Sequence, residues 1–183
     1  MIIREYDSRV HCSGSIIAPK LILTAGHCFA ENSDNYIPKD KLRIVFGMHD
    51  LTDLDRSFIP KTIRKIKEVK VHPDYKWPKA YFDIVILKLY KRVVFSENIY
   101  PVCLPDVENA DRNHLKRDSV TVVGFGPVDE NSKTMRQISQ RIRSYNYCNA
   151  RYKAENADIR LRSLLLRTLP DGFNDALICA QNQ

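Results

Sequence analysis

Short runs of apolar residues, each bounded by turn residues, recur along the chain. They are Ser15 to Ile17, Leu21 to Leu23, Leu42 to Phe46, Val69 to Val71, Ile84 to Leu89 and Ser119 to Gly124. Turn signals such as Ala18-Pro19-Lys20 and His72-Pro73-Asp74-Tyr75 separate them. Short strands at this spacing are typical of an all-β sandwich or barrel, so we expect an all-β fold. Ile2-Ile3-Arg4 is expected to be a strand that runs on into Cys12.

Two further segments carry a recognisable periodicity. Lys61 to Val71 is strongly basic, with an apolar residue at every second or third position. This alternation predicts a half-buried strand with a solvated cationic face. Ala157 to Thr168 has apolar residues at helical spacing and ends before the turn Leu169-Pro170-Asp171-Gly172, so it predicts a helix. The polar segment Pro105 to Arg117 predicts a boundary between two groups of strands.

Composition and charge narrow the possible functions. The chain has 183 residues and a formal net charge of +7, and its basic stretch carries no aromatic ladder for stacking bases. We therefore expect a basic protein surface and no nucleic-acid partner. No apolar run approaches the roughly 18 residues of a membrane helix, so no membrane partner is expected either. The start, Met1 to Asp7, has no basic head followed by an apolar segment, and no signal peptide is expected in these residues.

Five cysteines leave two chemistries open. They allow two disulfides and one thiol, which implies an oxidising compartment, or a set of free thiols in the cytosol. His11-Cys12 and His27-Cys28 offer four potential zinc ligands, but adjacent ligands separated by fourteen residues match no usual zinc spacing. We expect no metal and no cofactor.

One histidine and one aspartate stand in positions suited to acid–base chemistry. His27 follows the apolar run Leu21 to Leu23, and an imidazole near its free pKa is the usual general base at neutral pH. Asp83 stands at the mouth of the apolar run Ile84 to Leu89, where a carboxylate is costly unless it is paired. A histidine N–H would satisfy it and would also set the tautomer of the ring.

The motifs around these residues resemble the trypsin/chymotrypsin-like serine proteases, in order along nearly the whole chain. The motifs are Thr24 to Cys28, Phe46 to Leu51, Val71 to Tyr75, Phe82 to Leu89, Pro101 to Pro105, Val123 to Gly126 and Leu177 to Ala180. The resemblance implies two Greek-key β-barrels, with a first barrel at residues 1–105 and an incomplete second barrel at 116–183. It also implies a secreted protein that acts on a protein or peptide substrate. Gly26 stands where the family usually has alanine, and we expect this change to be tolerated.

The family's site residues map onto this chain only in part. The resemblance implies that His27 is the general base and that Asp83 orients it. It also implies the disulfides Cys12–Cys28 and Cys148–Cys179. Cys103 resembles the cysteine that often ties the catalytic domain to a propeptide or regulatory segment, so it is expected to be unpaired here or linked to such a segment.

The nucleophile of the family has no counterpart among these residues. In the family, a Gly-Asp-Ser-Gly-Gly motif follows the segment that Leu177 to Ala180 resembles, and none of the serines of this chain stands in that context. The serines are at positions 8, 13, 15, 33, 57, 96, 119, 132, 139, 144 and 163. We therefore expect a fragment of a serine endopeptidase that lacks the nucleophile-bearing part. The alternatives are a non-catalytic protease homologue that binds or regulates a partner and an unrelated cytosolic β protein with free thiols.

Overall fold

The computed structural model describes seven stretches of the chain. They are residues 1–6, 9–30, 35–54, 62–105, 119–125, 133–152 and 159–182. Strands dominate these stretches, and the all-β prediction is confirmed. Within them, no helix combines the length and the apolar character that crossing a membrane requires.

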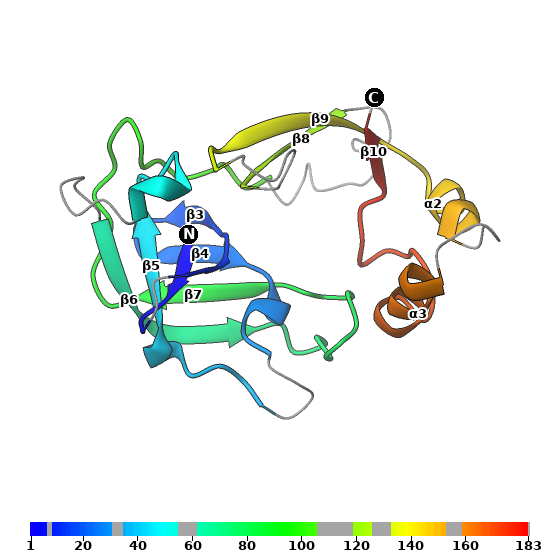
Figure 1. The fold of residues 1–183 in the computed structure, drawn as a ribbon, viewed down its shortest axis with the longest axis horizontal. Coiled ribbons are helices and arrows are strands. Elements are labelled where there is room, and N and C mark those ends of the chain that lie inside the picture. Colours follow the sequence, from blue (N-terminus) through cyan, green and yellow to red (C-terminus); the bar gives the residue numbers. More distant parts are fainter. Residues whose placement is uncertain are drawn as a thin grey trace.

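The larger sheet has seven antiparallel strands. In sheet order they are β2 (Val10–Cys12), β1 (Ile2–Arg4), β5 (Leu42–Phe46), β6 (Thr62–Val71), β7 (Val85–Leu89), β4 (Leu21–Thr24) and β3 (Ser15–Ala18). Two residues alone join β2 to β3, although these strands lie at opposite edges of the sheet. The sheet must therefore curl until its edges approach each other, and Figure 1 shows it as a half-barrel.

Alternation along the strands places the core inside this curl. Val85, Leu87 and Leu89 of β7 are buried, whereas Lys88 between them is exposed. One cluster of buried apolar side chains fills the interior. It consists of Ile2, Ile22, Cys28, Phe29, Leu42, Ile44, Phe46, Ile66, Val85, Leu87, Leu89 and Val93.

The rest of the described chain forms a smaller sheet and two helices. The sheet has the order β10 (Ala180–Asn182), β9 (Arg136–Ile142) and β8 (Ser119–Gly124), and the helices are α2 (Tyr145–Tyr152) and α3 (Ile159–Thr168). Helix α3 matches the helix predicted at 157–168, of which residues 157 and 158 lie outside the described ones. Figure 1 shows this smaller sheet outside the half-barrel, and an isolated antiparallel bridge between Asp50 and Thr134 joins the two where β9 begins. Its side chains Val122, Val123 and Ile138 are exposed.

Two expectations need comment. The single strand from Ile2 into Cys12 is wrong, because the segment folds back on itself and β1 pairs antiparallel with β2. In the hairpin, the main-chain N–H and C=O groups of β2 find hydrogen-bond partners on β1, which a straight strand would not provide. The Arg4 N–H closes the hairpin by donating to the Arg9 carbonyl at 3.0 Å. The division into barrels at 1–105 and 116–183 stays a prediction, since residues 106–118 lie outside the described ones.

The two parts are held together by one buried tyrosine and by main-chain hydrogen bonds. The Tyr81 hydroxyl donates to the Gly172 carbonyl at 2.7 Å and accepts from the Asp171 N–H at 3.0 Å. Beside it, the Ala80 N–H donates to the Thr168 carbonyl at 2.8 Å. The loop that leads into β7 therefore rests on the segment that follows α3.

Candidate active site

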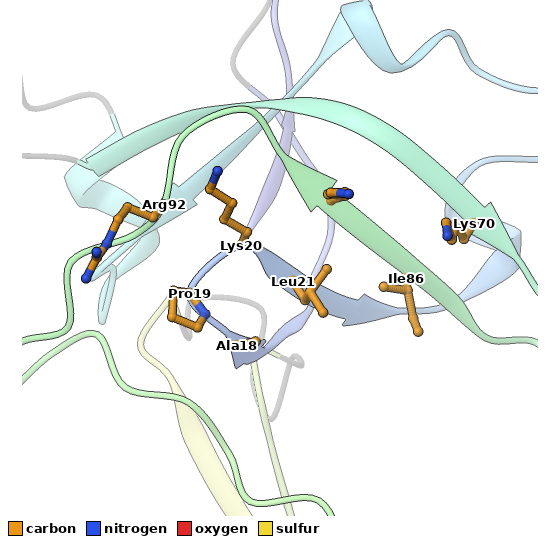
Figure 2. A pocket seen from close by; sticks show the side chains of 8 residues that line it. Ala18, Pro19, Lys20, Leu21, Lys70, Ile86 and Arg92 are labelled. Atoms are coloured by element: carbon orange, nitrogen blue, oxygen red, sulfur yellow. The ribbon is translucent and has the colours of Figure 1, made fainter.

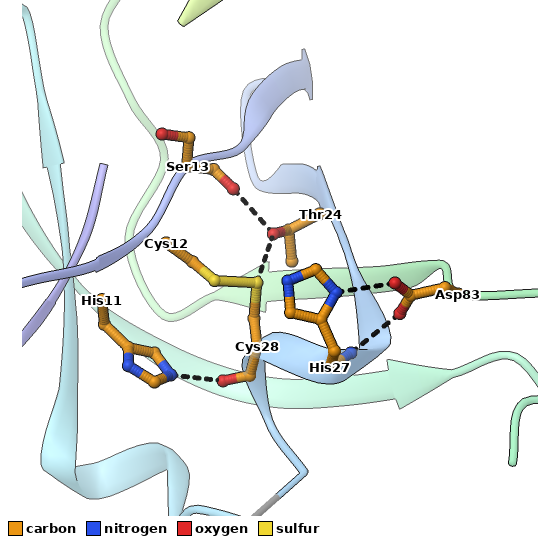
Figure 3. The surroundings of a disulfide bond; sticks show 7 residues. All are labelled: His11, Cys12, Ser13, Thr24, His27, Cys28 and Asp83. Atoms are coloured by element: carbon orange, nitrogen blue, oxygen red, sulfur yellow. Dashed lines mark hydrogen bonds and ion pairs between the residues drawn. A yellow bond between two sulfur atoms is a disulfide. The ribbon is translucent and has the colours of Figure 1, made fainter. Parts of the chain in front are cut away.

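His27 lies in a single 3-10 turn, η1 (Gly26–Cys28), directly after β4. The neighbouring residue Cys28 is buried and forms a disulfide with Cys12, at the end of β2, with Cα atoms 6.0 Å apart. The Thr24 hydroxyl at the end of β4 donates to the Ser13 carbonyl at 2.7 Å. These contacts, drawn in Figure 3, anchor the backbone on both sides of His27 to the opposite edge of the sheet.

Asp83 meets His27 through both of its carboxylate oxygens. Oδ2 lies 2.6 Å from Nδ1 of the imidazole, and Oδ1 accepts the main-chain N–H of His27 at 2.8 Å (Figure 3). A carboxylate only accepts hydrogen bonds, so Nδ1 carries the proton and Nε2 of the neutral ring keeps its lone pair. The side chain of His27 is 57% exposed and that of Asp83 only 21%. The basic nitrogen is therefore accessible, and the carboxylate that orients the ring is sheltered.

The residue before Asp83 has an uncommon backbone conformation. Phe82 has φ +54°, the one positive φ of a non-glycine residue among the described parts of the chain. Its carbonyl accepts the Ile84 N–H at 2.7 Å, and its ring stacks on His72 with centroids 5.0 Å apart. Left-handed backbone at a bulky residue costs free energy and persists where the surroundings hold it. This turn aims the Asp83 side chain away from β7 and toward His27.

Gly26 leaves room for an aromatic ring behind the pair. A Cβ at position 26 would lie 2.8 Å from two ring carbons of Tyr75 and 3.0 Å from Oδ1 of Asp83. Tyr75 is buried, and burial, followed by the negative charge of Asp83, raises its pKa to about 12. A neutral tyrosine ring therefore lies near both the Gly26 backbone and the carboxylate of Asp83. The expected tolerance of glycine at this position thus has a structural basis, because Tyr75 occupies the space.

The candidate metal ligands near His27 already form other bonds. The ligand atoms of Cys12, His27 and Cys28 lie within 4.8 Å of one another, but the two sulfur atoms are bonded to each other. Metals bind thiolates, which a disulfide does not offer. His11 points elsewhere, and its Nε2 donates to the Cys28 carbonyl at 2.6 Å.

The other cysteines fall in the smaller part of the structure and in the segment that follows the half-barrel. Cys148 of α2 forms a disulfide with Cys179, just before β10. Cys103 is exposed and carries a free thiol. The structure thus contains both disulfides that the resemblance implies. The alternative prediction, a cytosolic protein whose cysteines are free thiols, is wrong for this chain.

Two contributors to the site lay beyond the reach of sequence reasoning. Tyr75 and Phe82 both stand in motifs that carry the resemblance, but neither was expected to act on Asp83. The signal for Tyr75 was Gly26, since a missing Cβ beside a catalytic candidate leaves space for another side chain. Nothing in the sequence predicted the backbone conformation of Phe82.

The fold and this pair agree with what comparison with known proteins shows. The family model described as "Trypsin" matches residues 2–182, so the chain belongs to the trypsin family of serine proteases. It is 32% identical over 156 residues to a protein of Polistes dominula named "Venom serine protease", an alignment that covers 83% of this chain and 53% of that protein. It is 37% identical over 117 residues to "Venom serine protease Bi-VSP" of Bombus ignitus, covering 64% of this chain and 30% of that protein. The chain thus spans about half, or less, of the length of these curated relatives.

Proposed function

We propose that this chain supplies the general base and the orienting carboxylate of a serine-type endopeptidase. The observation that carries the proposal is the two-point contact of Asp83 with His27, which engages Nδ1 and leaves Nε2 of this largely exposed side chain as the nitrogen that can act as a base. A base needs its lone pair free and its ring held still, and the contact provides both. Membership of the trypsin family supports the same reaction.

The proposed mechanism is acyl transfer in two steps. Nε2 of His27 takes the proton of a serine hydroxyl as its oxygen attacks the carbonyl carbon of the scissile peptide bond. The imidazolium then gives this proton to the leaving amine, and Asp83 stabilises the positive charge in the interval. Water repeats the sequence on the acyl-enzyme and releases the second product.

The attacking serine is assigned to a part of the protein outside these 183 residues. Within the described residues, no hydrogen bond joins Nε2 of His27 to a hydroxyl group. The serines of this chain also lack the Gly-Asp-Ser-Gly-Gly context of the family. The alignment covers 53% of the Polistes dominula protein, which is in keeping with a longer gene product.

Three further assignments go with this function. We place the protein outside the cell, because its disulfides need an oxidising compartment and both relatives are named as venom proteases. Its substrate is a protein or peptide. The exposed thiol of Cys103 is assigned to a disulfide with a propeptide or regulatory segment.

The alternative is a non-catalytic homologue that binds or regulates a partner. It is favoured by one observation, the lack of a serine in the nucleophile context. The experiment that separates the two begins with the full transcript and produces the whole gene product. A fluorophosphonate probe, which reacts with activated serines, should label this product but not residues 1–183 alone.

The control for this experiment is His27→Ala, which removes the base and should abolish labelling of the whole product. His49→Ala is the matched variant, since it also removes an imidazole, at an exposed position whose side chain does not contact His27 or Asp83, and labelling should remain. A full transcript whose product is not labelled would contradict the endopeptidase and favour the binding homologue.

A further inference from the structure

The turn that directs Asp83 toward His27 contains a residue in an unfavourable backbone conformation. Phe82 has φ +54°, which for a bulky side chain costs free energy unless its surroundings compensate. The residue is 42% exposed, so burial of its own ring compensates only in part. Among the residues that the structure describes, the ring stacked on it is the imidazole of His72. The two ring centroids are 5.0 Å apart and the ring planes lie 11° from parallel.

His72 is itself fixed by the turn in which it stands, directly after β6. Its carbonyl accepts the Tyr75 N–H at 3.1 Å, and Nδ1 of its ring accepts the Asp74 N–H at 3.2 Å. A neutral imidazole that accepts at Nδ1 carries its proton on Nε2. Both donors are main-chain groups, which every residue except proline keeps. The ring of His72 therefore presents a fixed face to Phe82.

His72 also reaches both residues that flank Asp83. On one side its ring stacks on Phe82, and on the other its main-chain N–H donates to the Ile84 carbonyl at 3.0 Å. The Ile84 N–H in turn donates to the Phe82 carbonyl at 2.7 Å, which closes a tight turn with Asp83 at its centre. A substitution of His72 keeps the main-chain contact and removes the ring, so the contribution of the ring can be measured by itself.

This arrangement is confined to the start of β7. Farther along the strand lies a pocket of about 700 Å³ (Figure 2). Its basic lining residues are Lys20, Lys70, Lys88 and Arg92. Neither His72 nor Phe82 lines this pocket, and neither belongs to the cluster of buried side chains inside the half-barrel. Substitutions of these two residues should therefore act on the turn and leave the core intact.

We propose that His72 is a positioning residue, whose ring stacks on Phe82 and so holds the turn that directs the Asp83 carboxylate at His27. The gain from one stacked aromatic pair is of the same order as the cost of one left-handed residue, so loss of the ring is enough to shift this turn. Another conformation of Phe82 would redirect the side chain that follows it. The carboxylate would then lose its two-point contact with His27.

The test reads that contact in the whole gene product. Nitrogen NMR of the His27 imidazole distinguishes the tautomer with its proton on Nδ1, which the carboxylate favours, from the tautomer with its proton on Nε2. Two variants separate the ring of His72 from its hydrogen bond. His72→Asn offers an amide oxygen to the Asp74 N–H but no ring, whereas His72→Phe offers a ring but no acceptor.

The ring, and not the hydrogen bond, should decide the result. In His72→Asn, the ratio of the Nδ1–H tautomer of His27 to the Nε2–H tautomer should fall about fivefold, as expected for the loss of one aromatic pair. His72→Phe should keep the ratio of the unmodified protein. The matched control is Phe95→Ala, which removes a different aromatic contact, with Tyr100, and should also keep the ratio.

Substitutions of Phe82 test whether the ring acts through the backbone. Asparagine adopts the left-handed conformation more readily than most residues with a side chain. Phe82→Asn should therefore keep the tautomer ratio without any stack, whereas Phe82→Ala should lower it as His72→Asn does. In the Phe82→Asn background, His72→Asn should cause no further loss, because no stack is left to remove.

In the active enzyme, the same change should appear in kcat. This consequence rests on the proposed function, in which Asp83 stabilises the imidazolium but does not touch the substrate. His72→Asn should therefore lower kcat about tenfold or more, the effect of a misplaced group, and leave KM unchanged. A structural defect that disturbed substrate binding would raise KM instead.

Three results would overturn the proposal. They are an unchanged tautomer ratio in His72→Asn, a lowered ratio in His72→Phe, and an equal loss from His72→Asn with and without Phe82→Asn. The tautomer ratio does not depend on a serine nucleophile. If the fluorophosphonate probe fails to label the whole gene product, the endopeptidase function fails, and the ratio still decides the role of His72.

Discussion

Oδ1 of Asp83 accepts the main-chain N–H of His27 at 2.8 Å, while Oδ2 lies 2.6 Å from the ring nitrogen Nδ1 of the same residue. The main-chain contact fixes the carboxylate relative to the turn that carries His27, whatever the ring does. The imidazole is therefore hydrogen-bonded to a carboxylate whose own position does not depend on the rotation of the ring. This arrangement, formed across 56 residues of sequence, sets the tautomer on which the proposed chemistry depends.

The first prediction concerns the charge of this carboxylate. Asp83→Asn keeps the shape of the side chain but can replace a carboxylate oxygen, which accepts a hydrogen bond, with an amide nitrogen, which donates one. With this donor facing Nδ1, the imidazole favours the tautomer that carries its proton on Nε2. In the whole gene product we expect kcat to fall roughly 10⁴-fold. Asp74→Asn, on an exposed carboxylate of the preceding turn, should leave kcat unchanged. Activity of Asp83→Asn within tenfold of the unmodified enzyme would contradict the proposed role.

The second prediction concerns the space beside Gly26. In a helical turn, alanine is ordinarily more stable than glycine by about 1 kcal/mol. Here the added methyl would meet the buried Tyr75 ring at 2.8 Å, so we expect Gly26→Ala to lower the free energy of unfolding by about 1–3 kcal/mol. Gly124→Ala is the control, since nothing lies within 4 Å of its added Cβ. Denaturant titration measures both, and a stabilised Gly26→Ala variant would show that Tyr75 does not fill this space.

The third prediction concerns alkaline pH. The pKa of Tyr75 is raised from 10.0 to about 12, so the folded chain holds this proton more tightly than the unfolded chain does. The resulting stabilisation is complete below pH 10 and is lost as the pH rises through about 12. Titration of tyrosine absorbance should show a late ionisation that Tyr75→Phe removes. Tyr90→Phe, at an exposed tyrosine, should leave that late step in place, and its disappearance there would refute the assignment.

The fourth prediction concerns the junction between the two parts of the structure. The Tyr81 hydroxyl is hydrogen-bonded to Gly172 and Asp171, and the residue is 7% exposed. Tyr81→Phe leaves both main-chain groups without this partner, and we expect a loss of about 1–3 kcal/mol in the free energy of unfolding. Tyr100→Phe, at a tyrosine that is 74% exposed, is the matched control. Equal stability of the two variants would mean that the junction does not depend on this hydroxyl.

The fifth prediction concerns the disulfide beside His27. Cys12→Ser with Cys28→Ser opens a loop of 16 residues, and in the chain-entropy model this costs about 3 kcal/mol. Cys103→Ser removes a free, exposed thiol and should leave the thermal midpoint unchanged. A double variant as stable as the unmodified chain would mean that the half-barrel holds its two edges together without the disulfide.

The apolar pattern predicted much of the half-barrel and little of the smaller sheet. Strands β4, β5 and β7 are short apolar runs with buried residues in each, and these runs are visible in the sequence. Strand β9 was missed because it is almost entirely exposed and has no apolar face to recognise. Helix α2 was missed for the same reason, since none of its residues is buried.

Sequence alone was sufficient for the all-β class and for the motifs of the trypsin family, because both depend on residues close together along the chain. It also singled out His27 and Asp83 as candidates. Tertiary structure decided which atoms of these two residues meet, that a ring fills the space beside Gly26, and that Lys20, Lys70, Lys88 and Arg92 border one pocket. These relationships depend on strand register and on the curl of the sheet, which bring distant segments together and which no local pattern encodes.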